Sequence, residues 1–404
     1  MQRLAKKTAV VSHVLPPSPS GQSVMLMRVL EEIDPRDYVL ITSAPEPATD
    51  GDEAPALPAP CYRISPAAPL TFRWPRALGP VRGIVSVVAN VLRRAAEIAR
   101  IVRRERCESI VACTGDLYDL PAAYVASRVL GIGFHPYVFD DYVYQWPASA
   151  SRRVAERIAP YVMRGADSVI VPNEFLRDEY RRRYHIMPVI VRNPIARPAV
   201  GARVANEGSA RSRGQRIVYT GAVYHAHFDA FRNLVAALAL LADPRFRLHV
   251  YTANTQDELR AAGIEGPVVT HPHQPPERMD GIHDAADMLF LPLAFHSTIP
   301  EVIRTSAPGK IGEYLASGRP ILVHAPADSF VAWYFRTHEC GMVVDELSPE
   351  RMAAALRRLD EDGALRERLV HNARERARLD FDPVASRAAF MHAISLNSAR
   401  AQDA

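Results

Sequence analysis

The 404-residue chain carries 49 Lys and Arg side chains against 45 Asp and Glu, so its formal net charge is only +4. This length suits two ordinary domains, and so small a net charge gives no reason to expect attraction of the whole protein to nucleic acid. Apolar residues make up 48% of the chain, as in soluble globular proteins, and no apolar run approaches the roughly 18 residues that span a membrane.

The first half alternates short β-type runs with helix-length segments. Strands are predicted at 8–15, 38–42, 109–114, 135–140, 168–172 and 188–193, and helices at 22–33, 82–106, 119–130, 150–164 and 173–184. The stretch 44–60 is rich in Ala and Pro and predicts a surface loop within this half.

The second half repeats the alternation. Strands are predicted at 216–223, 246–252, 268–271, 288–293, 320–325 and 341–345, and helices at 228–242, 255–262, 276–286, 308–317, 328–337, 348–360 and 364–378.

Regular β-α alternation indicates an α/β protein with two doubly wound, Rossmann-like domains. The predicted domains are 1–195 and 215–380, joined by a linker at 196–214 that lacks an apolar period. Two such domains face a central cleft, where ligands meet the carboxyl ends of the strands. Functional side chains are therefore expected just after strands.

Lysine is rare in this chain, and one lysine has a distinctive setting. Of the 49 basic residues only Lys6, Lys7 and Lys310 are lysine. Lys310 follows a predicted strand and loop, at the predicted start of a helix that Ser306 can cap. The N–H groups of a helix N-terminus bind anions, so Lys310 is a candidate phosphate ligand.

Glu313 lies three residues after Lys310 and shares its helix face. A cation beside a diphosphate and a carboxylate that accepts from ribose hydroxyls would together bind a nucleotide. The alternative from the pattern alone is a surface Lys–Glu ion pair of small energetic value.

The first half offers candidates of the same kind. Gly21 lies between the first strand and the first helix, where its backbone can approach a ligand, although a plain tight turn is an alternative. Asp116, Asp140 and Asp141 follow two later strands. Each is a candidate catalytic residue that would orient or deprotonate an acceptor hydroxyl, and helix capping is the alternative for each.

The segment SAPGKIGEYLASGRPIL (306–322) resembles the donor site of GT-B fold glycosyltransferases, especially glycosyltransferase family 4. Weaker similarity covers 166–184, 189–195, 216–238 and 275–293. The resemblance implies transfer of a sugar from a nucleotide diphosphate donor, without a cofactor or metal, and with retention of anomeric configuration. It also implies that the C-terminal helix, within 381–404, crosses back to the first domain.

The chain departs from the family pattern at two places. The family commonly carries two glutamates eight positions apart, and here Thr305 stands eight positions before Glu313. The family's basic pair after the first strand of the second domain is also missing, since the loop at Gly221 reads GAVYHAH. Lys310 and Arg304 are expected to supply the missing charge, and neutral His225 or His227 can hydrogen-bond phosphate instead.

The sequence thus predicts a glycosyltransferase of hexosyltransferase type that acts on a glycan or lipid-linked acceptor. The donor-site residues are Gly21, Gly221, His225, Arg304, Thr305, Ser306, Lys310 and Glu313. A non-catalytic nucleotide-sugar-binding or assembly protein, kept open by Thr305, and a sugar-nucleotide epimerase on the same fold are the alternatives.

Two further expectations concern partners and surroundings. Basic helical faces at 93–106 and around Arg152 and Arg157 suit peripheral contact with an anionic membrane, with a solvated face as the alternative. Four widely spaced cysteines predict free thiols and a cytoplasmic location. The pairs His225–His227 and His271–His273 invite a metal interpretation, but no nearby Cys or Asp completes a ligand set, and no metal is expected.

Overall fold

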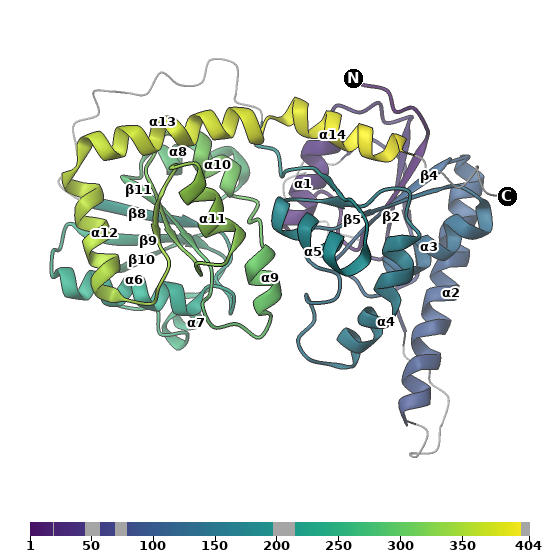
Figure 1. Ribbon diagram of the computed structural model, residues 1–404, viewed down its shortest axis with the longest axis horizontal. Helices are drawn as coiled ribbons and strands as arrows, with labels where there is room; N and C mark the ends of the chain where they lie inside the picture. The colour runs from purple at the N-terminus through teal and green to yellow at the C-terminus, as the bar shows by residue number, and fades with distance from the viewer. Residues whose placement is uncertain (19, 45–56, 69–78, 197–214, 397–404) are drawn as a thin grey trace. The chain divides into compact units, whose positions relative to one another are not determined.

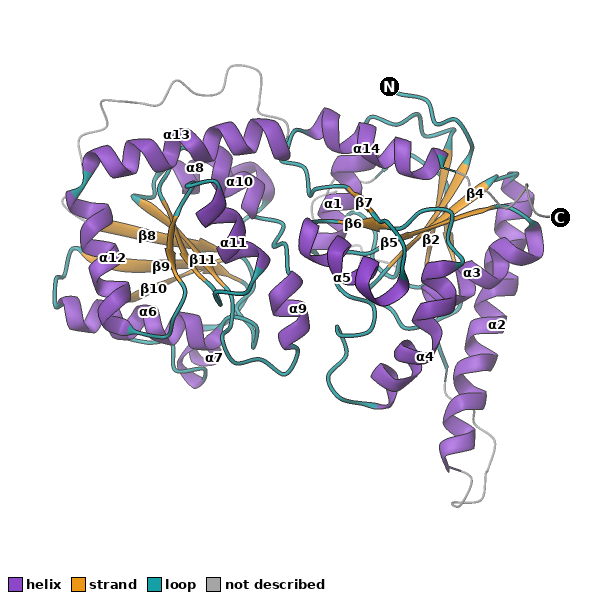
Figure 2. Ribbon diagram, viewed as in Figure 1, coloured by secondary structure: helices purple, strands orange, loops and turns teal. Residues whose placement is uncertain are grey.

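The computed structural model describes residues 1–18, 20–44, 57–68, 79–196 and 215–396. The chain divides into two compact units, one formed by Met1–Pro194 with Pro383–Ala404 and the other by Ile195–Asp382. The segment predicted to return to the first domain, 381–404, is therefore divided between the units at Asp382. All of the predicted linker except Ala196, and most of the predicted loop at 44–60, lie outside the described residues. Each unit is a parallel sheet with helices on both faces (Figures 1 and 2).

The first unit holds a seven-stranded parallel sheet with the order β3-β2-β1-β4-β5-β6-β7. Its strands are β1 (Thr8–Val11), β2 (Tyr38–Thr42), β3 (Cys61–Arg63), β4 (Ser109–Cys113), β5 (Gly133–Tyr137), β6 (Ile170–Val171) and β7 (Val189–Ile190). The order reverses between β1 and β4, so the loops that follow these two strands lie at the position where doubly wound folds bind ligands.

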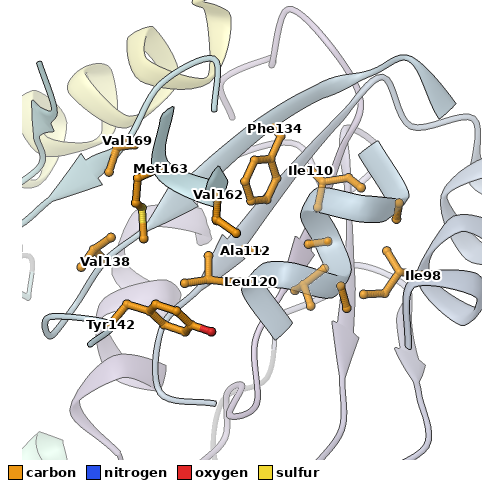
Figure 3. Close-up of a cluster of buried hydrophobic side chains, with 14 of the residues drawn as sticks. Ile98, Ile110, Ala112, Leu120, Phe134, Val138, Tyr142, Val162, Met163 and Val169 are labelled. Carbon is orange, nitrogen blue, oxygen red and sulfur yellow. The ribbon is translucent and has the colours of Figure 1, made fainter. Parts of the chain in front are cut away.

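Both faces of this sheet are covered, which is why its central strands β1, β2 and β4 are fully buried and mostly apolar. The helices are α1 (Gly21–Leu30), α2 (Gly79–Glu105), α3 (Asp119–Leu130), α4 (Ala150–Arg164), α5 (Glu174–Tyr184) and α14 (Pro383–Ser395). Within β4, Ile110 and Ala112 face the cluster built with α2–α5 (Figure 3), whereas Val111 and Cys113 face the cluster that contains α1 and α14. This alternation follows from the two-residue period of a strand.

Helix α14 is fixed to α1 by a buried arginine. The Arg387 side chain is fully buried, and its Nη1 donates to Glu32 Oε2 at 2.5 Å. Its Nε donates to the Val29 carbonyl at 3.2 Å, near the end of α1. A buried guanidinium needs such partners, so the C-terminal helix is an integral part of the first unit.

The second unit holds a six-stranded parallel sheet with the order β10-β9-β8-β11-β12-β13. Its strands are β8 (Gln215–Thr220), β9 (Phe246–Thr252), β10 (Val268–Pro272), β11 (Met288–Pro292), β12 (Ile321–His324) and β13 (Met342–Val344). Its helices are α6 (Phe228–Leu241), α7 (Gln256–Ala261), α8 (Pro276–Asp284), α9 (Pro300–Thr305), α10 (Ile311–Ala316), α11 (Phe330–Thr337), α12 (Pro349–Glu361) and α13 (Gly363–Asp380). The order reverses between β8 and β11.

Two short elements escaped sequence-based prediction, namely β3 and α9. Strand β3 has three residues, and α9 has six, so neither is long enough to show a hydrophobic period. No helix within the described residues combines the length and apolarity needed to cross a bilayer.

Candidate functional site

The switch point of the second unit places Lys310 beneath the loop that follows β8. Lys310 Nζ donates to the Thr220 carbonyl at 2.7 Å and lies 3.8 Å from the centroid of the Tyr219 ring. A Cβ built on Gly221 would meet the same nitrogen at 3.1 Å. Desolvation lowers the pKa of Lys310 to about 7, and the charge of Glu313 opposes that change.

Gly221 allows the loop to turn over the lysine. Its φ is +120°, in a region of backbone conformation that residues other than glycine rarely adopt. The Gly221 N–H donates to the Tyr251 carbonyl at 2.9 Å, and the Tyr219 hydroxyl donates to the Ala222 carbonyl at 2.7 Å. Asn254 Oδ1 accepts from the Val223 N–H at 2.9 Å. These bonds hold the loop backbone in one conformation.

The two histidines of this loop differ sharply in their surroundings. His225 is exposed, whereas His227 is buried as the residue before α6. Burial, and then the nearby charge of Lys310, lowers the pKa of His227 to about 3, so its imidazole is neutral. Its Nδ1 is buried with no hydrogen-bond partner among the described residues. Neither histidine lies on a strand, so the predicted common face that motivated a metal interpretation of this pair is absent from the described structure.

The prediction of one helix over 308–317 with Ser306 as its cap was wrong. Ser306 follows α9 as its C-terminal cap in an extended conformation, and α10 begins only at Ile311, with Lys310 as its N-cap. Pro308 explains the break, because the residue before a proline is driven out of the helical region. Lys310 therefore owes its position to the turn between two short helices.

The remaining predicted donor residues are dispersed along this segment. Arg304 lies half-buried in the last turn of α9, and the Thr305 hydroxyl donates back to the Glu301 carbonyl at 3.0 Å. Glu313 lies half-buried in the first turn of α10. The structure thus brings Gly221 and Lys310 into contact, with Glu313 close enough to affect the lysine pKa.

Sequence reasoning missed Tyr219 and Tyr314. The Tyr314 hydroxyl accepts from the Thr220 N–H at 3.2 Å, which fixes the end of β8 against α10. Both tyrosines are fully buried. A tyrosine directly after two aliphatic residues near the end of β8 was the available signal for Tyr219. Its contact with Lys310, however, joins residues 91 positions apart in the numbering.

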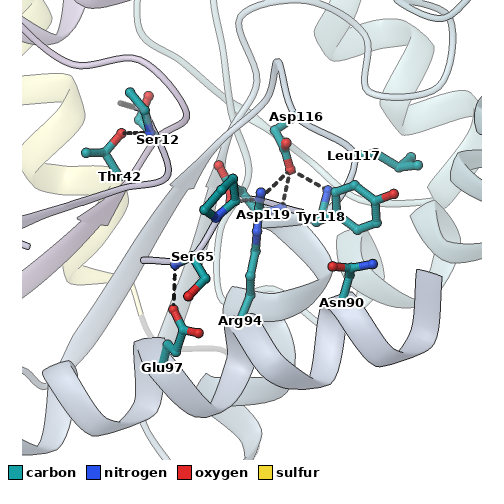
Figure 4. Close-up of polar contacts among 12 residues, drawn as sticks. Ser12, Thr42, Ser65, Asn90, Arg94, Glu97, Asp116, Leu117, Tyr118 and Asp119 are labelled. Atoms are coloured by element: carbon teal, nitrogen blue, oxygen red, sulfur yellow. Dashed lines mark hydrogen bonds and ion pairs between the residues drawn. The ribbon is translucent and has the colours of Figure 1, made fainter. Parts of the chain in front are cut away.

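In the first unit the half-buried Asp116 belongs to an ionic cluster with the buried Arg94 and Asp119 (Figure 4). Arg94 Nη1 lies 2.7 Å from Asp116 Oδ1 and 2.5 Å from Asp119 Oδ1. Asp116 Oδ1 also accepts from the backbone N–H groups of Tyr118 and Asp119 at 2.6 and 3.0 Å. These bonds fix the turn just before α3, whose N-cap is Tyr118, and so give Asp116 a structural role close to the helix capping that was its alternative.

Asp140 and Asp141 are adjacent but differ in their contacts. Asp141 is buried, and its Oδ1 accepts from the N–H groups of Val143 and Tyr144, both at 2.9 Å. Its other oxygen pairs with Arg183. Asp140 is exposed at its surface, although the protein around it shields its carboxyl from part of the solvent. This desolvation, and then the charge of Asp141, raise the pKa of Asp140. Of the three candidate carboxylates, Asp140 is the one best placed to meet a ligand from solvent.

Gly21 is the first residue of α1, after the N-cap Ser20, whose side chain accepts from the Ser23 N–H at 3.2 Å. A Cβ at Gly21 would meet nothing within 4 Å. The protein itself therefore does not require a glycine here.

Within the described residues no group of three or more His, Cys, Asp and Glu side chains is arranged to hold a metal ion. His271 of the second histidine pair contacts His249, with 2.9 Å between His249 Nδ1 and His271 Nε2. Metal independence stays a prediction.

Comparison with known proteins locates the family of the second unit. Residues 214–362, which include Gly221, Lys310 and Glu313, match the family described as Glycosyl transferases group 1. The match covers 149 of the 404 residues of the chain. No curated protein sequence matches the chain. The narrower assignment to glycosyltransferase family 4 stays a prediction.

Solved structures resemble the whole chain, including the first unit, which the family match does not reach. A glycosyltransferase from Rickettsia africae is 12% identical with a TM-score of 0.64, and 97% of this chain and 98% of that chain are covered. HepE from Anabaena, in complex with UDP and glucose, is 13% identical with a TM-score of 0.65 and coverages of 96% and 99%. Sucrose-phosphate synthase from Thermosynechococcus elongatus is 15% identical, with a TM-score of 0.64 and coverages of 97% and 98%. The chain has the GT-B fold of two Rossmann-like domains.

Proposed function

We propose that this protein is a glycosyltransferase that moves a sugar from a nucleoside diphosphate donor to a hydroxyl of a glycan or lipid-linked acceptor. The observation that carries the proposal is the Lys310 ammonium group beneath Gly221, at the switch point of the unit that matches the glycosyl transferases group 1 family. A cation held in this way stabilises the diphosphate as it departs. Similar folds that bind UDP and glucose, such as HepE, support a nucleotide-sugar donor.

The proposed reaction retains anomeric configuration and needs no metal ion, and the transferred group is a hexose. Glu313 would accept hydrogen bonds from the ribose, and Asp140 would orient the acceptor hydroxyl. Catalysis would rest on holding donor and acceptor together and on the counter-charge of Lys310.

Release of free nucleoside diphosphate from a panel of UDP-, ADP-, GDP- and CDP-sugars tests the proposal, with acceptor glycans present and absent. We expect acceptor-dependent release from one donor class that survives addition of a chelator. Tight nucleotide binding without turnover across broad acceptors would favour a nucleotide-sugar-binding protein. That alternative has some support, because the Thr305 hydroxyl at the missing glutamate position is bonded to the Glu301 carbonyl.

Glu313→Gln should weaken binding of the nucleoside diphosphate about five- to tenfold, because a hydrogen bond to a charged group is worth roughly 1.5 kcal/mol more than none. Calorimetric titration measures the affinity, and thermal unfolding without nucleotide checks that the fold is intact. Comparison of UDP with the 2′-deoxy diphosphate refines the test, since the two ligands should bind the variant with more similar affinities. An unchanged affinity for UDP would refute the ribose assignment.

Asp140→Asn should lower kcat about five- to tenfold without lowering the melting temperature, because an acceptor hydrogen bond of roughly 1–1.5 kcal/mol is weakened. Asp141→Asn is the matched control, since it removes the buried pair with Arg183 and should lower the melting temperature. A loss of stability in the Asp140 variant, or wild-type kcat, would assign Asp140 no role at the acceptor.

Contact with an anionic membrane is proposed as a further property of the first unit. The described part of α2 exposes Val85, Val88 and Leu92, and basic side chains lie further along the same helix. Helix α4 exposes Tyr161 and carries several arginines. Such faces favour the surface of an anionic bilayer. Co-sedimentation with phosphatidylglycerol vesicles but not phosphatidylcholine vesicles is the expected result, and equal recovery with both would contradict it.

A further inference from the structure

His13 lies at the switch point of the first unit. It is the second residue after β1, and Gly115 is the second residue after β4, so both belong to the loops where the strand order reverses. A Cβ built on Gly115, whose φ is +113°, would meet His13 Cε1 at 2.0 Å. The imidazole therefore lies directly against the backbone of Gly115, in space that any other residue at this position would fill.

The two ring nitrogens of His13 differ in their surroundings. Nδ1 is buried and has no hydrogen-bond partner among the described residues. Nε2 also makes no hydrogen bond to these residues, but it is not buried, so water or a ligand can reach it. Because a buried N–H without an acceptor is costly, the ring proton belongs on Nε2, and a second proton on Nδ1 is disfavoured. Burial accordingly lowers the pKa of His13, although the charge of Asp116 opposes this change.

The charges near His13 favour a neutral ligand over a phosphate. Arg94 is shared between Asp116 and Asp119, whose Oδ1 atoms lie 2.7 and 2.5 Å from Arg94 Nη1, so this cluster offers no excess of positive charge. The hydrogen bonds of Asp116 to described residues all use Oδ1, and 21% of its side chain is exposed. A carboxylate oxygen repels phosphate but accepts from a hydroxyl. An N–H near such an oxygen matches the acceptor and the donor of one sugar hydroxyl.

We propose that His13 binds the acceptor of the transfer reaction, and that its Nε2–H donates a hydrogen bond to a hydroxyl oxygen of a neutral hexose ring. Gly115 is the positioning residue, because only a glycine leaves room for the imidazole. The inference rests on the proposed function, since it takes the glycan acceptor as the ligand. The contact lies in the first unit, whereas the proposed donor contact, Lys310, belongs to the second.

Kinetics with simple acceptors test the contact. The probes are the methyl pyranosides of glucose, galactose and mannose, each offered with the UDP-, ADP-, GDP- and CDP-sugars. His13→Phe keeps a ring against Gly115 but has no N–H, so kcat/KM for the accepted hexoside should fall about five- to tenfold. The KM of the donor, and its hydrolysis by water without acceptor, should stay unchanged. His13→Gln should recover part of the loss, because its amide N–H can donate in place of Nε2–H.

The role of Gly115 has its own variant and a matched control. Gly115→Ala should lower kcat/KM for the hexoside as His13→Phe does, because the new methyl group overlaps the imidazole and displaces Nε2. Gly131 has a φ of +67° and open space at its Cβ position, so Gly131→Ala should lower the melting temperature without changing kcat/KM. In the His13→Ala background the overlap is gone, and adding Gly115→Ala should cause little further loss of kcat/KM.

Nitrogen NMR gives a readout that does not depend on turnover. With ¹⁵N-labelled histidine, the ring nitrogen shifts show which nitrogen carries the proton, and loss of one signal set in His13→Phe assigns them. At pH 7.5 we expect the proton of His13 on Nε2, and a change in the Nε2 shift when the accepted methyl hexoside is added. A proton on Nδ1 would leave no donor at Nε2 and would overturn the inference.

The kinetic outcomes separate this inference from the proposed function. Wild-type kcat/KM for the hexoside in His13→Phe would overturn the contact and leave the proposed function standing. An equal loss of donor hydrolysis would also overturn it, since His13 would then support the fold and not the acceptor. If sugar transfer occurs to other acceptors but to none of the three hexosides, the assignment to a neutral hexose ring is wrong. If no donor gives transfer to any acceptor, the proposed function and the inference both fail.

Discussion

Lys310→Ala should weaken binding of the preferred nucleoside diphosphate roughly 30- to 100-fold, because hydrogen bonds to charged groups are worth about 1.5–3 kcal/mol and no second lysine lies in this domain. Lys310→Arg should recover part of this loss. Its planar guanidinium keeps the charge, but it must fit where Gly221 leaves the amine 3.1 Å from a Cβ position.

Affinity should be measured by calorimetry at pH 6.5, where the wild-type amine is mostly charged. Thermal unfolding without nucleotide is the control, because the alanine variant also leaves the Thr220 carbonyl without its 2.7 Å partner. A correctly folded alanine variant that binds as the wild type does would end the assignment of Lys310 as the diphosphate counter-charge. The donor would then depend on other groups.

Much of the fold was predictable because its strands are buried on both faces. Runs such as 110–113 are apolar without interruption, and the helices between the strands carry clear periods. The edge strand β3 was not predictable, since Cys61 and Arg63 are exposed and three residues show no pattern. Helix α9 was missed because six residues show no clear period, and its absence from the prediction moved the expected start of α10 to residue 308, with Ser306 as its cap.

The candidate site was predictable in its charges but not in their contacts. Rarity and position identified Lys310, yet the ring and the carbonyl that hold it come from Tyr219 and Thr220, on a strand far away in sequence. For Asp116 and Asp141, position in the sequence was not enough to assign a role. A carboxylate just after a strand serves equally well to cap a helix or to meet a substrate, and only three-dimensional contacts distinguish the two roles.

Gly221→Ala should reduce both stability and donor binding, for two separable reasons. Alanine rarely adopts a φ of +120°, which costs about 1–3 kcal/mol of strain. The new methyl group would also lie 3.1 Å from Lys310 Nζ and displace the amine from its place beneath the loop. We expect a lower melting temperature together with a loss of nucleotide affinity of tenfold or more, since a charged contact of about 1.5–3 kcal/mol is disturbed.

Two other glycines separate these causes. Gly266 has a φ of +103°, but a Cβ there would meet only Val235 Cγ1 at an ordinary 3.8 Å. Gly266→Ala should therefore lower the melting temperature like Gly221→Ala while leaving nucleotide affinity unchanged. Gly21→Ala meets no atom within 4 Å and lies in a helix, so it should not destabilise the protein. If Gly266→Ala weakened binding as much as Gly221→Ala, the effect would come from loss of fold, and the contact between Gly221 and Lys310 would have no special part in holding the donor.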